Sequence, residues 1–193
     1  MAGHANYTAL LDANTLYPIL TCDALLSLAS TGLFAPKWSE RIEDEWMRNL
    51  AQNKPELADK LGFRRDTMRC AAPDWQVSEE AISALLPCLK LPDPDDTHVL
   101  AAAITGHADC IITFNLKDFP AETLEPFGIE AIHPDRFIIS QIDLDPFRAI
   151  AALKKMRKRR KSPPMAPDAF ADAFERNGLP AVASRLREAI ELI

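Results

Sequence analysis

The sequence predicts an α/β protein: a parallel β-sheet flanked by helices, with a small helical appendage at the C-terminus. Short apolar runs that end in polar residues alternate with longer segments of helical periodicity, which is typical of parallel strands joined by crossover helices. With 193 residues, 48% of them hydrophobic, the chain is long enough for one sizeable core. We place the α/β domain at residues 1–143 and a basic helical extension at residues 144–193.

Three short runs have the character of strands. "YTALLDAN" is an apolar run that ends in polar residues, as a buried strand does. "ADCIITFN" contains the β-formers Ile111, Ile112 and Phe114 and is too short for a helix. "EAIHP" is a weaker third strand. Because helices separate them, we expect these strands to pair in parallel.

Five segments between the first two strands have helical spacing. Ser39 and Ser78 are predicted N-caps, and Gly32 is a predicted helix C-cap because glycine accepts left-handed dihedrals. The expected helices cover residues 16–32, 38–53, 55–72, 77–89 and about 96–106.

The composition changes near residue 144. Asp145-Pro146 is a helix start, with Asp at the N-cap and Pro at the first helical position. The predicted helix ends before Ser162-Pro163-Pro164, and two further amphipathic helices follow, separated by Gly178 and Pro180. Residues 146–193 carry a net charge of +6, whereas residues 1–145 carry −12. An acidic body with a basic tail indicates a partner that the tail attracts by charge.

Composition also argues against some classes of protein. No run of about 18 apolar residues is present, so we expect no membrane span, and the N-terminus lacks the basic and apolar regions of a secretory signal. The cysteines show no metal-binding spacing, which favours reduced, buried thiols in a cytoplasmic protein. These cysteines are Cys22, Cys70, Cys88 and Cys110.

Acidic side chains recur where a parallel sheet forms ligand sites, at the carboxyl ends of its strands. Asp12 ends the first strand, and Asp118 lies just beyond the second, which ends at Thr113 and Asn115. Asp96 begins the helix that leads into the second strand. Glu45 flanks the apolar face of its helix, so its carboxylate can reach the crevice.

Each acid has an alternative explanation. Asp12 can serve as a turn former, Asp96 as a helix N-cap, Glu45 as a solvated helix residue, and Asp118 as an N-cap for the segment that follows it. We expect solvent exposure for the remaining acids near these positions and for one histidine on the helix surface. These residues are Glu43, Asp44, Asp93, Asp95 and His98.

Four carboxylates and one amide that converge from separate segments would form a hard, oxygen-rich site. Such donors suit Mg²⁺ or Mn²⁺, whereas zinc prefers His or Cys. Without a cation the acids would repel one another, and crowding would raise the pKa of at least one of them. With a metal, the site can hold a phosphodiester and activate a water.

Four stretches carry a family resemblance: "LLDANTLYP", "WSERIEDEWMRNL", "DPDDTHVLAAAI" and "IITFNLKDFP". Their order and spacing over residues 8–140 resemble those of PIN-domain nucleases, and among these the VapC-type ribonuclease toxins of toxin–antitoxin pairs. The helical tail is similar to the C-terminal extension of one PIN subgroup.

The resemblance implies a metal-dependent endoribonuclease on a PIN-like parallel sheet, with Mg²⁺ or Mn²⁺ as the cofactor. It implies that Asp12, Glu45, Asp96 and Asp118 are catalytic, and Glu43 and Asp44 compete with Glu45 for the second motif. Three of these acids and an amide would bind metal, and three further residues would support them. The metal ligands would be Asp12, Asp96, Asp118 and Asn115; the supporting residues would be Asn14, Thr113 and Asp95.

The resemblance also implies partners: an RNA substrate and a cognate antitoxin, which would place a cation in the acidic crevice. The basic run "KKMRKRRK" suits RNA phosphates, although a solvated helix end is the alternative. Its cations are Lys154, Lys155, Arg157, Lys158, Arg159, Arg160 and Lys161. Apolar faces on the first helices allow a homodimer.

Two other functions compete with this prediction. "DANT" after a strand approximates a motif of haloacid-dehalogenase-like phosphatases, but Asn14 stands where that scheme needs a general acid. A catalytically silent RNA-binding PIN module is the third hypothesis, and the presence of all four acids argues against it.

Overall fold

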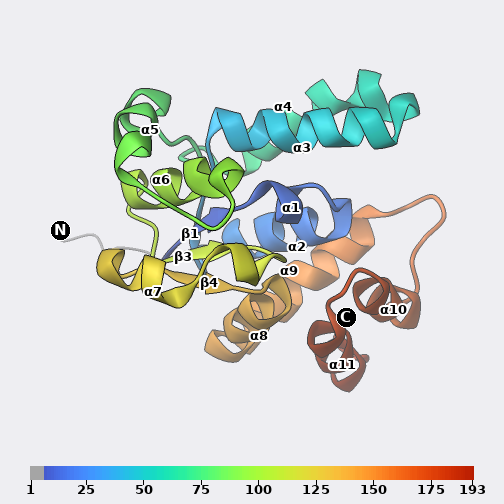
Figure 1. Cartoon of the computed structure of the whole chain (residues 1–193). Coiled ribbons are helices and arrows are strands. Elements are labelled where there is room, and N and C mark those ends of the chain that lie inside the picture. Colours follow the sequence, from blue (N-terminus) through green and yellow to red (C-terminus); the bar gives the residue numbers. More distant parts are fainter. Residues whose placement is uncertain (1–6) are drawn as a thin grey trace. The chain divides into compact units, whose positions relative to one another are not determined.

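A computed structural model describes residues 7–193 (Figure 1). Its strands form one four-stranded parallel sheet with the order β2-β1-β3-β4, so the predicted α/β class is confirmed. The strands are β1 (Thr8–Leu11), β2 (Ala35–Lys37), β3 (Cys110–Ile112) and β4 (Glu130–Ile132). Residues 1–6, which form part of the predicted signal-free N-terminus, lie outside the described residues.

The two central strands are apolar on both faces. Leu10 pairs with Ile111 in register, and all of β3 and most of β1 are buried. Parallel strands that are covered on both faces need continuous apolar runs rather than alternation, which is the pattern that predicted them.

The strand β2 was not predicted. Its sequence Ala-Pro-Lys lacks the β-branched and aromatic residues that usually mark a strand. It lies at the edge of the sheet, where Pro36, which has no backbone N–H to donate, is tolerated.

Contacts divide the chain into two compact units. Unit 1 comprises the residues up to Tyr17 and Phe34–His133, and unit 2 comprises Pro18–Leu33 and Pro134–Ile193. The domain boundary predicted between residues 143 and 144 stays a prediction; residues on both sides of it belong to unit 2.

Unit 1 contains the sheet and the helices that connect its strands. The helix α6 packs against β1 and β3, and α3 and α4 lie side by side (Figure 1). The N-caps Ser39 and Ser78 are confirmed, since their side chains accept hydrogen bonds from the N–H groups of Ile42 and Ala81. The α-helices of unit 1 are α1 (Ala13–Leu16), α3 (Glu40–Asn53), α4 (Ala58–Ala71), α5 (Glu79–Leu85), α6 (Thr97–Thr105) and α7 (Ala121–Leu124). Its 3₁₀ turns are η1 (Pro55–Leu57), η2 (Leu86–Cys88), η3 (Pro94–Asp96), η4 (Leu116–Asp118) and η5 (Glu125–Phe127).

Unit 2 is helical. Its helices are α2 (Ile19–Ala29), α8 (Pro134–Leu144), α9 (Pro146–Arg159), α10 (Pro167–Arg176) and α11 (Pro180–Glu188). The predicted cap Asp145 is confirmed by its side-chain bond to the Arg148 N–H. The single helix expected over residues 16–32 is wrong, because the chain breaks at Pro18 and α2 ends at Ala29. Gly32 lies in the turn beyond, with φ +78°.

The helix α8 was not predicted either, although Pro134 at its start and Phe137, Ile138 and Ile142 on its buried face are helix signals. The expectation that all four cysteines are buried is wrong for two of them: Cys70 and Cys88 are exposed, while Cys22 and Cys110 are buried. A search of the described residues finds no helix with the length and apolar character needed to cross a membrane.

Candidate metal centre

The site forms where β1 and β3 end side by side. Asp12 directly follows β1 and is almost completely buried. Its Oδ2 atom accepts hydrogen bonds from Thr113 Oγ1 at 2.7 Å and from Asn14 Nδ2 at 2.6 Å. Asn14 also accepts from the backbone N–H of Phe114 at 3.0 Å, so one amide connects the ends of both strands. This network fixes the orientation of the Asp12 carboxylate.

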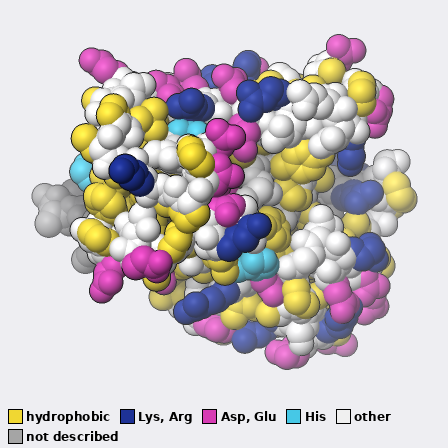
Figure 2. Space-filling model, viewed as in Figure 1, with side chains coloured by type: hydrophobic (Ala, Val, Ile, Leu, Met, Phe, Trp, Pro, Cys, Tyr) yellow, Lys and Arg dark blue, Asp and Glu magenta, His cyan; other side chains and the backbone are white. Residues whose placement is uncertain are grey.

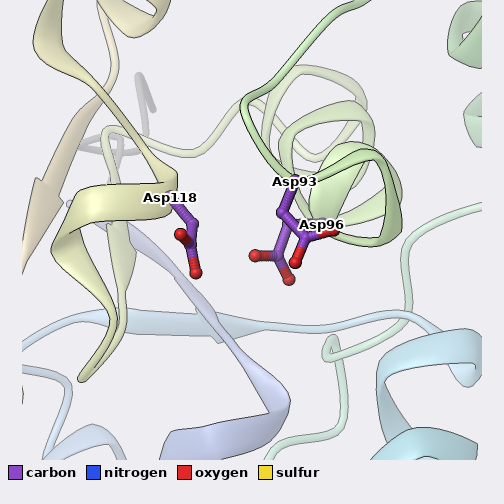
Figure 3. A group of neighbouring side chains, drawn as sticks. All are labelled: Asp93, Asp96 and Asp118. Atoms are coloured by element: carbon purple, nitrogen blue, oxygen red, sulfur yellow. The ribbon is translucent and has the colours of Figure 1, made fainter.

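Three further carboxylates lie close together at the same edge (Figure 3). One oxygen from each of Asp93, Asp96 and Asp118 lies within 4.8 Å of the other two. Asp93 and Asp96 come from the segment that begins α6, and Asp118 ends η4, so both sides of the group are fixed by short helical turns. We call Asp12, Glu45, Asp93, Asp96 and Asp118 the acid cluster. Figure 2 shows acidic side chains gathered beside the α6 region of this face.

Asp93 caps η3 by accepting a hydrogen bond from the Asp95 N–H, but helix capping does not account for Asp96 or Asp118. Asp96 occupies the N-cap position of α6, but its side chain makes no capping hydrogen bond. Asp118 does not cap the following helix, because α7 begins at Ala121 with Pro120 in the N-cap position. The amide of Asn115 donates a hydrogen bond to Asp118 and so orients that carboxylate.

The three neighbouring acids of α3 have different surroundings. Glu43 was expected to face solvent, but that expectation is wrong. Its side chain is buried and binds Arg69, and it accepts a hydrogen bond from Trp38 Nε1 at 3.2 Å. Asp44 is exposed. Glu45 remains as the acid of this trio that electrostatically raises the pKa of both Asp12 and Asp96.

His98 was expected on the helix surface, and this expectation is also wrong. Its side chain is buried, and its Nε2 atom lies 3.3 Å from Glu45 Oε2. No hydrogen-bond partner for Nδ1 is found in the described part of the chain. The contact with Glu45 is an ion pair when the imidazole is protonated, and it places the His98 ring beside the Glu45 carboxylate. The apolar run Val99–Ala103, which directly follows His98, was the sequence signal for its burial.

Burial and mutual repulsion perturb the acids strongly. Burial, followed by the charge of Glu45, raises the pKa of Asp12 to about 6, although the Thr113 hydrogen bond opposes this rise. The pKa of Asp96 rises to about 7, first through burial and then through the charges of Asp12, Asp118, Asp93 and Glu45. Five carboxylates therefore act on one another, and a cation between them would relieve that repulsion.

The donor set fits a hard divalent cation. The side-chain atoms that converge here, from Asp93, Asp96 and Asp118, are all carboxylate oxygens. Such ligands suit Mg²⁺ or Mn²⁺ better than zinc. Asp95 was predicted as a supporting residue, but its side chain is exposed and does not join the group of Asp93, Asp96 and Asp118. Its backbone N–H donates a hydrogen bond to Asp93 Oδ1 at 2.9 Å. Asp93, expected to be peripheral, contributes one of the three converging carboxylates.

The predicted RNA-binding cations lie in unit 2, and three of them are engaged within it. Lys154 donates to the carbonyl of Leu192 at 2.8 Å, and Arg157 donates to the carbonyls of Met165 and Ile193. Arg159 binds Asp23 and donates to Ser27 Oγ at 2.8 Å. The exposed cations without such a bond are Lys155, Lys158, Arg160 and Lys161.

Comparison with known proteins agrees with this arrangement. Residues 8–117 match the family model described as "PIN domain". The chain belongs to the PIN-domain family. Residues 134–188 match a second model, "VapC50 C-terminal domain", and this match begins at the same residue as the C-terminal part of unit 2. The predicted resemblance to VapC-type PIN proteins with a C-terminal extension is thereby confirmed.

One similar protein is the "Putative ribonuclease VapC50" of Mycobacterium tuberculosis (strain ATCC 25618 / H37Rv). It is 39% identical to this PIN-domain chain over 92 residues, which are 48% of this chain and 54% of the relative. The match therefore spans about half the length of that relative. No solved structure matches the chain significantly.

Proposed function

We propose that this PIN-domain protein is a divalent-metal-dependent endoribonuclease. The observation that carries the proposal is the acid cluster: carboxylates from four separate segments meet at the carboxyl ends of β1 and β3. Burial and repulsion raise the pKa of Asp12 and of Asp96, as expected for groups whose natural state includes a cation. The name of the similar mycobacterial protein, a putative ribonuclease, supports RNA as the substrate.

The residues of the acid cluster and their hydrogen-bond partners would have different roles in RNA cleavage. Asp12, Asp96 and Asp118, with Asp93 beside them, would hold Mg²⁺ or Mn²⁺. When bound, such an ion polarises a phosphodiester and lowers the pKa of a water. Glu45, held by His98, would orient that water and accept its proton. Thr113 and Asn14 keep the Asp12 carboxylate aimed at the cluster, and the amide of Asn115 does the same for Asp118.

Four exposed cations support an RNA-binding role for unit 2. The side chains of Lys155, Lys158, Arg160 and Lys161 form no hydrogen bond or salt bridge within the described residues. Like charges this close repel one another, and a bound polyanion would relieve that repulsion. Lys154, Arg157 and Arg159 would contribute charge but are held in place by their own bonds. Contacts of this kind would be salt-sensitive and would carry little sequence information.

We further propose that the protein is a cytoplasmic toxin that a cognate antitoxin inhibits. The antitoxin would place an Arg or Lys in the acid cluster, where it would substitute for the charge of the metal. Growth on induced expression tests this: wild type should arrest growth, Asp12→Asn should not, and co-expression of a cognate antitoxin should restore growth.

The direct test is cleavage of RNA by the purified full chain in Mg²⁺ or Mn²⁺, with and without EDTA. We expect EDTA to stop cleavage, and Asp12→Asn, Asp96→Asn and Glu45→Gln each to lower kcat at least about a hundredfold. Asp74→Asn, an exposed acid away from the cluster, is the matched control and should cleave normally.

Three results would contradict the proposal. Full activity of both Asp12→Asn and Asp96→Asn would show that the acid cluster does not take part in RNA cleavage. Robust turnover of p-nitrophenyl phosphate would favour a phosphatase. Tight RNA binding without cleavage in any divalent metal would favour a silent binding module.

A further inference from the structure

A cavity of about 290 Å³ adjoins the acid cluster. The segment from Asp93 to His98 contributes to both: Asp93 and Asp96 belong to the cluster, whereas Pro94, Asp95 and Thr97 line the cavity. Consecutive Cα atoms are about 3.8 Å apart, so a ligand in the cavity would lie within one nucleotide of the acids. His98, which holds Glu45, also borders the cavity.

The lining of the cavity includes one cationic and one anionic side chain that do not form an ion pair. Arg41, near the start of α3, and Asp95 both line it, and neither side chain forms a hydrogen bond or salt bridge within residues 7–193. Two opposite charges that face one space without contact leave room for a ligand with complementary groups between them. The rest of the lining comes from three apolar side chains, Leu86, Leu89 and Pro94, and from the polar side chains of Thr97 and His98.

These groups match the parts of a nucleotide. A guanidinium binds phosphate through paired N–H donors. The apolar side chains suit the flat face of a base. An ionised carboxylate only accepts hydrogen bonds, so Asp95 needs a donor such as the exocyclic amine of cytosine, adenine or guanine. Uracil has no exocyclic amine and offers only its single ring N3–H on that edge.

We propose that this cavity binds the nucleotide next to the cleaved phosphodiester, with Arg41 on a phosphate and Asp95 selecting a base that carries an amino group. The inference rests on the proposed ribonuclease function and specifies its substrate. It also assigns Asp95 to base selection rather than to support of the metal.

The test uses the full chain and a random-sequence oligoribonucleotide pool, with the cleavage positions read by sequencing. We expect wild type to cleave beside amino-bearing bases in preference to uracil, and Asp95→Asn to reduce that preference about five- to tenfold, because an amide both donates and accepts. Arg41→Ala should raise KM about tenfold with kcat retained. Arg48→Ala, an exposed arginine two turns further along α3, is the matched control and should leave both quantities unchanged.

A binding measurement separates this inference from the proposed function. Titration of ¹⁵N-labelled wild type with CMP and with UMP should shift the amides of Arg41, Leu89 and Thr97 more strongly with CMP. If wild type cleaves RNA but Asp95→Asn and Arg41→Ala match it in preference and KM, the cavity assignment is overturned and the ribonuclease stands. If no RNA is cleaved, the ribonuclease fails, and the titration alone decides: CMP shifts at the cavity support a nucleotide site, and their absence overturns it.

Discussion

Asp96 combines an anchored backbone with an unfavourable charge. It occupies the N-cap position of α6 without a capping hydrogen bond, and its pKa rises to about 7 because burial and four neighbouring acids disfavour its charged form. Residues at functional sites often reduce the stability of the empty protein in this way. The stability of the protein without metal should therefore depend on pH in a specific direction.

The folded state binds a proton at Asp96 more tightly than the unfolded chain, in which the pKa of aspartate is about 3.9. The free energy of unfolding in EDTA should therefore fall as the pH rises from about 4 to about 7. Asp96→Asn should be more stable than wild type at pH 7.5, and the difference should narrow toward pH 4.5. Urea denaturation across this range measures both effects, and parallel curves for the two proteins would contradict the prediction.

His98 gives a second prediction at the scale of a single residue. Its Nε2 atom contacts Glu45, so His98→Leu should lower kcat about 10- to 100-fold with little change in KM. His98→Gln, whose amide can donate from a similar position, should recover much of that loss. If both variants cleave RNA like wild type, His98 does not position Glu45.

The helix α3 carries two buried or half-buried acids with different roles. The buried Glu43 pairs with Arg69, whose side chain is partly exposed, whereas Glu45 faces the acid cluster. Glu43→Gln should lower the free energy of unfolding by about 2–4 kcal/mol, because it leaves Arg69 without its partner charge. Glu45→Gln should stop RNA cleavage with little loss of stability. Denaturation and cleavage assays on both variants check this pair, and the opposite assignment of effects would mean that Glu43 is the second motif acid.

In unit 2, one side chain fixes the start of the last helix. The carboxylate of Asp135 on α8 accepts hydrogen bonds from the backbone N–H groups of Ala181 and Val182, both at 2.9 Å. Asp135→Ala should cost about 1–2 kcal/mol of stability, as loss of a helix cap does, and Asp135→Asn should cost less. Thermal denaturation tests this; equal melting temperatures for all three proteins would show that the cap does not stabilise α11.

Elements with strong local signals were predictable from the sequence, and elements that depend on long-range contacts were not. The caps Ser39, Ser78 and Asp145 act within three residues of themselves, so the sequence reveals them. The edge strand β2 exists because β1 offers it a partner, which no local pattern encodes. In the site, the order of the acids along the chain indicated the cluster. The charged partners of Glu43 and His98 were not predictable, because Arg69 and Glu45 lie far from them along the chain.

At the scale of the whole molecule, the charge asymmetry predicts how RNA binding responds to salt. Lys155→Ala combined with Lys158→Ala removes two exposed cations of α9. Each phosphate contact on a single strand contributes about 0.7 to the magnitude of the slope of log affinity against log salt. If both lysines contact phosphates, the double variant should therefore reduce the magnitude of this slope by about 1.4. The matched control is Lys54→Ala with Lys60→Ala, two exposed lysines of unit 1. An equal change in both double variants would show that the basic run has no special role.

The position of α2 limits how the chain can be shortened. This helix lies early in the sequence, yet it packs with α8, α9 and α10, which come more than a hundred residues later. A chain that stops at His133 would keep α2 but lose these neighbours, and side chains such as Cys22, Leu25 and Leu28 would meet water. Such a fragment should aggregate. The PIN domain therefore cannot be isolated by trimming the tail, and a shorter version would need a redesigned, polar α2.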